Sequence, residues 1–126
     1  MKNAKVIMGV RIVLGLILVV FGLNKFLQFM PFPPMPVPAG AFMGALMASG
    51  YLMTIVAIVE IAVGAMLLTN KYVALALLLL APISVNIITF HIFLDIAGIG
   101  GAALVTILNV FLLFANKEKY NSVLSA

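Results

Sequence analysis

The stretch that decides the fold is residues 51–69, YLMTIVAIVEIAVGAMLLT, an apolar run with one charged residue, Glu60, at its centre. At about 1.5 Å per residue, a helix of this length crosses nearly the full thickness of a bilayer's hydrocarbon core, about 30 Å. Three similar apolar runs predict further helices over residues 6–28, 72–94 and 99–116. The sequence therefore predicts an all-α fold, a four-helix transmembrane bundle that forms one membrane domain over residues 1–126.

The composition supports a membrane environment. Hydrophobic residues make up 66% of the chain and charged residues 8%, whereas globular domains carry about 25% charged residues. In water this excess would leave large exposed apolar patches, so the lipid bilayer is the expected partner. The basic residues stand near the ends of the apolar runs and form no basic stripe, which argues against a nucleic-acid partner. The absence of cysteine excludes thiol exchange and Cys-ligated zinc or iron–sulfur clusters within this chain.

Two segments between the first two spans are too short or too rich in proline to cross a bilayer. Residues 30–38, MPFPPMPVP, hold five of the six prolines and predict an extended loop. Residues 39–49 are apolar but too short to span, so they predict an interfacial or re-entrant helix. At the start of the chain, basic residues precede an apolar run as in a signal peptide. Arg11 interrupts that run and no small-residue cleavage site follows, so a retained signal anchor is expected.

The distribution of basic residues predicts the orientation. Six of the seven fall on the side of the two termini, and only Lys25 falls on the opposite side. The positive-inside rule then predicts a multi-pass protein of the cell inner (cytoplasmic) membrane, with both termini cytoplasmic and the proline-rich loop outside.

Ionisable residues inside the spans are the candidates for function. Inserting a charge into hydrocarbon costs about 2.5–3.5 kcal/mol, so such a residue is expected to face the bundle interior or water. Glu60 lies at the predicted midplane, where Asn86 should reach the same depth. We expect Glu60 to contact Asn86 or a cation of the first helix. The alternative is a purely structural interhelical hydrogen bond beside Gly64.

The first helix carries two cations on one face. Arg11 and Lys25 share this face with Gly15 and Gly22, so small residues would admit a neighbouring helix while the cations look inward. The alternative is that both side chains extend to the two membrane interfaces.

A second polar layer is predicted near the outer ends of the helices, from Asn24, Lys25, His91 and Asp95. The alternative here is a local hydrogen bond in which Asp95 caps the helix and holds His91. Thr106, Asn109 and Asn116 form a weaker stripe, which we assign to helix packing. The ionisable residues are too scattered in depth for a metal cluster, so no metal is predicted.

Several motifs spread over nearly the whole chain carry a family resemblance. They are residues 11–16 (RIVLGL), 21–26 (FGLNKF), Gly50-Tyr51, Glu60 with Gly64, 81–83 (API), Asn86 and 90–95 (FHIFLD). The last run, at that distance after proline and asparagine, is the most specific. On these pieces the chain resembles the DoxX family of small four-helix bacterial membrane proteins, whose members are commonly linked to quinol or quinone oxidoreductases.

Two functions are compatible with these residues. The first is a quinone- or quinol-associated subunit that works with a partner redox protein. Its catalytic residues would be Glu60 and His91, and its substrate-binding residues would be Asn24, Lys25, Asn86, Asp95 and Arg11. The second is a non-catalytic scaffold or lipophile-binding module, in which the polar residues only lock the bundle. The sequence leaves open whether the chain is catalytic and whether it forms a homo-oligomer.

Overall fold

The computed structural model describes residues 4–28 and 34–125. Five helices of at least three turns dominate it: α1 (Ala4–Leu27), α2 (Val37–Ala48), α3 (Leu52–Thr69), α4 (Val73–Leu94) and α5 (Ile99–Ala115). Shorter turns follow α4 and α5: η1 (Ile96–Gly98), η2 (Lys117–Tyr120) and α6 (Asn121–Leu124). No strand occurs in the described ranges, so the predicted all-α class is confirmed.

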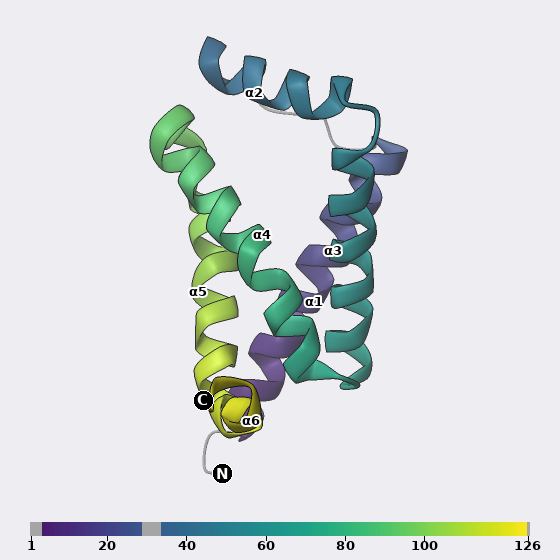
Figure 1. Cartoon of the computed structure of the whole chain (residues 1–126), viewed down its shortest axis with the longest axis vertical. Helices are drawn as coiled ribbons and strands as arrows, with labels where there is room; N and C mark the ends of the chain where they lie inside the picture. The colour runs from purple at the N-terminus through teal and green to yellow at the C-terminus, as the bar shows by residue number, and fades with distance from the viewer. Residues whose placement is uncertain (1–3, 29–33, 126) are drawn as a thin grey trace.

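Four segments are long and apolar enough to cross a membrane: α1, α3, α4, and η1 joined to α5. Their bounds agree with the predicted spans to within three residues at each end. Figure 1 shows these helices running up and down the long axis of the molecule, with α2 lying across one end. We call this the α2 end. The opposite end, where both termini lie, is called the terminal end.

The bundle is built from two helix pairs. α1 packs most extensively against α3, and α4 packs against α5. α3 and α4 meet next to the turn that joins them and diverge toward the α2 end (Figure 1). As a result, no residue of α4 beyond Ser84 is buried.

Glycines allow the close approach of α1 and α3. A Cβ atom added at Gly64 would lie 2.6 Å from Val19 Cγ2 and 2.8 Å from the Gly15 carbonyl oxygen. One added at Gly22 would lie 2.7 Å from Ile61 Cγ1. Lipid tails are as apolar as leucine, so helices in a bilayer associate through close packing of this kind. The predicted glycine-lined face of the first helix is therefore the α3 contact.

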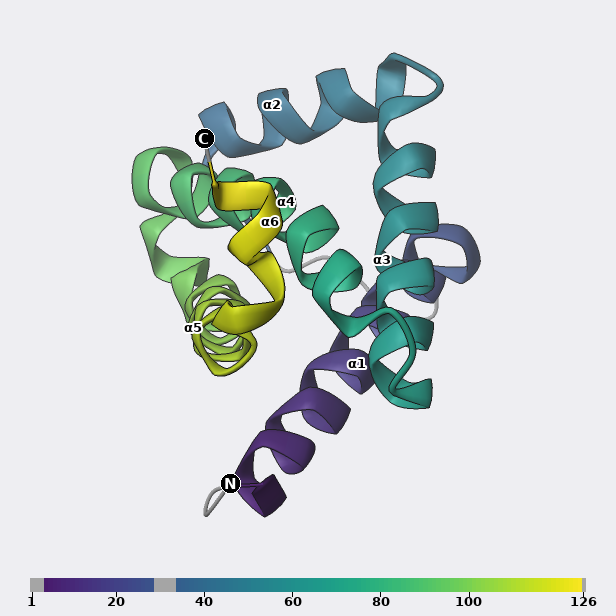
Figure 2. The same ribbon diagram turned by 60° about the horizontal axis from the view of Figure 1, so that its bottom comes forward.

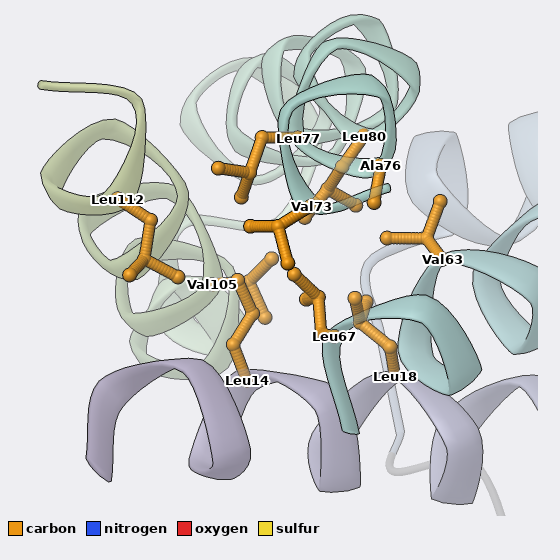
Figure 3. Packing of buried hydrophobic residues seen from close by; sticks show 10 residues of the cluster. All are labelled: Leu14, Leu18, Val63, Leu67, Val73, Ala76, Leu77, Leu80, Val105 and Leu112. Atoms are coloured by element: carbon orange, nitrogen blue, oxygen red, sulfur yellow. The ribbon is translucent and has the colours of Figure 1, made fainter. Parts of the chain in front are cut away.

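Apolar side chains from α1, α3, α4 and α5 fill the space where the two pairs meet, as Figure 3 shows. Leu14 and Leu18 rise from α1 toward Leu67 of α3 and toward a row on α4 that includes Leu77. These four leucines are 0–1% exposed. This apolar cluster lies mainly in the half of the bundle nearer the terminal end.

The helix between the first two spans lies across the bundle, as expected for an interfacial segment (Figure 1). It begins at Val37, so the predicted loop extends too far by including Val37 and Pro38. Proline is tolerated there because the first N–H groups of a helix need no intrahelical partner. Gly50, at φ +83°, reverses the chain after α2, and the Ser49 hydroxyl accepts the first N–H of α3 from Leu52 at 3.1 Å. Residues 30–33 of the predicted loop lie outside the described residues.

Candidate functional site

A buried ion pair joins α1 to α3. The Lys25 ammonium lies 2.6 Å from Glu60 Oε1, and the two side chains are 20% and 4% exposed. Glu60 stands midway along α3, whereas Lys25 stands in the last turn of α1. The contact with a cation of the first helix, one of the two partners expected for Glu60, is therefore present.

The antiparallel pairing explains how residues at different heights meet. Every Cα–Cβ bond of an α-helix tilts toward the N-terminus of that helix. The Lys25 side chain therefore leans from the α2 end toward the middle of the bundle, and the Glu60 side chain leans the opposite way. Gly22, one turn before Lys25, leaves room for the pair, because a Cβ added there would lie 3.3 Å from Glu60 Cβ.

Asn86, the alternative partner named in the prediction, does not reach Glu60. Asn86 is exposed, and its side-chain amide donates to the Pro82 carbonyl oxygen at 2.8 Å, within α4. Equal depth was the basis of the prediction, but α4 leans away from α3 beyond Ser84. Depth along the membrane normal does not determine which helices touch.

The predicted outer layer divides into two separate groups. His91 Nδ1 lies 3.0 Å from the Asp95 carbonyl oxygen and 3.7 Å from Asp95 Oδ2. A Cβ added at Gly98 would lie 2.9 Å from Asp95 Oδ2, so η1 folds tightly over this pair. Within residues 4–28 and 34–125, the ion pairs are Lys25–Glu60 and His91–Asp95, and neither bridges to the other. Asn24 is buried on α1 beside Lys25.

The His91–Asp95 group thus has the geometry of the alternative interpretation, a local hydrogen bond at the end of α4. His91 also packs edge-on against Phe90, whose ring stands 5.5 Å from that of Phe42 in α2. These rings connect α4 to the helix that crosses the bundle end. His91 therefore lies where α4, η1 and α2 meet.

Arg11 occupies a different place again. Its Nη1 donates to the carbonyl oxygen of Leu67, in the last turn of α3. The guanidinium therefore faces the bundle at the terminal end and lies at the negative end of the α3 dipole. The structure does not bring it to Lys25 and Glu60.

Several polar contacts were not predicted or were predicted only loosely. The Tyr120 hydroxyl donates to the Ala74 carbonyl oxygen at 2.9 Å, and Asn109 reaches the Leu77 carbonyl oxygen at 3.4 Å. Asn109 therefore packs helices together as expected, whereas Thr106 and Asn116 bond to carbonyls of their own helix.

Ser84 is a buried polar residue that the sequence analysis missed. It is 2% exposed, and its hydroxyl has no hydrogen-bond partner within the described ranges. It continues the buried face of α4 one turn beyond Leu80. This i+4 spacing was the available signal, but a serine in an apolar helix carries little weight without the tertiary structure.

The Lys25–Glu60 pair places a hydrogen-bond donor and a proton acceptor side by side within the membrane-spanning part of the bundle. The Lys25 ammonium carries three N–H donors, and the Glu60 carboxylate can accept a proton or a hydrogen bond. Among the described residues, no group of three His, Asp or Glu side chains is close enough to hold a metal ion.

No family model, no curated protein and no solved structure matches this chain. The resemblance to the DoxX family therefore rests on the sequence motifs quoted above.

Proposed function

We propose that this protein is a DoxX-like membrane subunit that binds a quinone or quinol beside the Lys25–Glu60 pair and handles the proton that accompanies its redox change. The observation that carries the proposal is the pair itself, a 2.6 Å ionic contact whose carboxylate is 4% exposed midway along a membrane-spanning helix.

An ion pair in this place is a poor way to stabilise a bundle. Replacing a buried pair by packed apolar residues of similar volume is often neutral or stabilising by about 1–4 kcal/mol. Ionisable residues inside spans are accordingly rare, and they commonly mark ligand sites or proton paths. Retaining Lys25 and Glu60 against this cost favours a role beyond packing.

The chemistry of the pair fits a quinone head group. A quinone carbonyl oxygen accepts hydrogen bonds, and the Lys25 ammonium, in ionic contact with Glu60, carries three N–H donors. Apolar residues Val56 and Val59 precede Glu60 by one turn or less on α3 and are half-buried, so the pair has an apolar surrounding on its own helix. The residues that would hold the head group are therefore Lys25 and Glu60.

A bound quinone would supply two-electron, two-proton redox chemistry. The sequence has no cysteine for a redox disulfide or an iron–sulfur cluster, so in this proposal electrons come from or go to a partner redox protein. Lys25 would donate a hydrogen bond to the quinone carbonyl oxygen and orient it. Glu60 would hold the proton that is exchanged with that oxygen. His91 and Asp95 stay outside this contact because they are bonded to each other at the corner with η1.

The experiment is lipid extraction of protein purified in mild detergent, followed by titration with a short-chain quinone. We expect a copurifying quinone, and we expect Lys25→Ala to weaken binding by about 1–3 kcal/mol through the lost hydrogen bond. Thr106→Val is the control, since that hydroxyl bonds to Ala102 of its own helix. Absence of quinone together with parent-like titration of Lys25→Ala would refute the proposal.

One set of observations favours a second function, a non-catalytic scaffold or lipophile-binding module. Asn109 and Tyr120 use their polar groups to tie one element of the bundle to another, as Arg11 does. If Lys25 and Glu60 serve only the same purpose, Glu60→Gln should leave both quinone binding and any proton-coupled activity of the assembled complex unchanged. That outcome would assign the protein to the scaffold class.

A further inference from the structure

The terminal end of the bundle concentrates positive charge. Of the six basic residues in the described ranges, five stand there, and Lys25 stands near the other end. The five are Lys5, Arg11, Lys71, Lys117 and Lys119. Figure 2 turns this end toward the viewer, with α1, the α3–α4 turn and α6 in front. Glu118 is the one acidic residue described at this end.

A groove of about 280 Å³ opens at this end between α1, the α3–α4 turn and the end of α5. Its polar lining comes from Arg11, Asn70 and Asn116, and its accessible apolar lining includes Ile7 and Met8. It thus places a cation and two amides next to an apolar floor.

Arg11 is held in position at this groove. One guanidinium nitrogen, Nη1, donates to the Leu67 carbonyl oxygen, which anchors the group against α3. A guanidinium carries five N–H donors in a rigid fork that suits phosphate geometry. No hydrogen bond to a second acceptor is found for Arg11 in the described part of the chain, so donors remain for a ligand.

The two amides are also placed by the backbone. Asn70 adopts the left-handed conformation that ends α3, at φ +57°, and its side chain has no hydrogen bond among the described residues. Asn116 uses one amide N–H on the Leu112 carbonyl oxygen. The amide hydrogens that remain on both residues can join the guanidinium around an anion.

We propose that this groove binds an anionic phospholipid, with the phosphate at Arg11, Asn70 and Asn116 and an acyl chain along Ile7 and Met8. The polar residues stand at the C-terminal ends of α3 and α5, next to the start of α4, which is the depth at which lipid headgroups lie. The apolar lining extends from there toward the hydrocarbon core. Basic pockets between membrane helices bind anionic headgroups in this way. Free phosphate would use only the polar part, so the apolar floor favours the lipid. This inference does not depend on the proposed quinone site.

Native mass spectrometry in mild detergent tests the proposal, with phosphatidylglycerol as the anionic probe and phosphatidylcholine of the same chains as the zwitterionic one. We expect the parent protein to retain phosphatidylglycerol selectively. Arg11→Gln should reduce its occupancy about tenfold, as expected for the loss of charge-assisted hydrogen bonds. Lys119→Gln is the matched control, because it removes one charge from the same end outside the groove lining.

Arg11 also anchors α3, so a second variant separates binding from folding. Asn70→Gly keeps the left-handed backbone at no steric cost and removes the exposed side chain with its amide. We expect it to weaken phosphatidylglycerol binding several-fold while the thermal stability without lipid stays near that of the parent. Equal retention of the two lipids would overturn the proposal, as would equal losses in Arg11→Gln and Lys119→Gln. Glycerol phosphate competing as well as the whole lipid would overturn it too.

Discussion

Removing the Lys25 ammonium should destabilise the bundle more than removing its carboxylate partner. Lys25→Met leaves the Glu60 carboxylate without a counter-ion at 4% exposure, whereas Glu60→Leu leaves the ammonium at 20% exposure. The ammonium has a way out, because it stands in the last turn of α1 and its flexible stem can extend to the bundle end. The carboxylate, midway along α3, has none.

The size of the effect follows from two competing costs. Breaking a buried pair by removing one partner costs about 3–5 kcal/mol. Protonation sets a ceiling on that cost, because a glutamic acid free in water has a pKa of about 4.3 and protonating it costs about 3.7 kcal/mol at pH 7 and about 1 kcal/mol at pH 5. We therefore expect Lys25→Met to lose about 3–4 kcal/mol of unfolding free energy at pH 7 and clearly less at pH 5. The double variant Lys25→Met/Glu60→Leu should recover most of the loss.

Unfolding in mixed micelles by dodecyl sulfate titration, followed by tyrosine fluorescence and circular dichroism, measures these differences. Lys71→Met is the matched control, an identical change at an exposed lysine without an ion pair, and should stay within about 0.5 kcal/mol of the parent. The reasoning fails if Lys25→Met behaves like Lys71→Met, if its loss is the same at both pH values, or if the double variant shows the sum of the single losses.

Three further predictions concern packing, orientation and the terminal end. Gly64→Ala should cost about 1–3 kcal/mol in the same unfolding assay, because the new Cβ would meet backbone 2.8 Å away, whereas Gly9→Ala points into open space and should cost nothing measurable. A tail residue, Asn121→Cys, should label only from the cytoplasmic side of sealed vesicles and Met35→Cys only from the other side; labelling of the tail from outside contradicts the predicted topology. Burial raises the pKa of Tyr120 above 10.0, so its contribution to stability is present below pH 10 and is lost as pH rises beyond it. Tyr120→Phe should lower stability by about 1 kcal/mol at neutral pH and flatten this alkaline loss; an unchanged pH profile would refute the assignment.

The spans were predictable because their signal is local. A helix in lipid must satisfy all its backbone hydrogen bonds internally and must match the thickness of the bilayer. Length and hydropathy therefore determine residues 52–69 and 73–94 almost to the residue, and the polar turn that begins at Asn70 marks the boundary between them. The glycine-lined face of the first helix was predictable for a similar reason, since small residues at helical spacing allow helices to approach.

The candidate site was predictable in part. A carboxylate at the centre of a span requires a partner, and the sequence offers few, so a contact from Glu60 to a cation of the first helix followed from composition and depth. The choice between Lys25 and Asn86 did not follow, because it depends on the divergence of α4 from α3. Ser84 was missed because a single hydroxyl in an apolar run carries no periodic signal, and its burial depends on residues distant in the chain.

By itself, then, the sequence determined the number, length and apolar character of the spans and the small set of polar residues within them, because each of these is a property of one helix and its solvent. The tertiary structure alone decided which polar residues meet. Lys25 reaches Glu60, and Arg11 reaches the end of α3 at the carbonyl of Leu67. Those choices depend on helix pairing and divergence, which arise from packing between segments far apart in the chain.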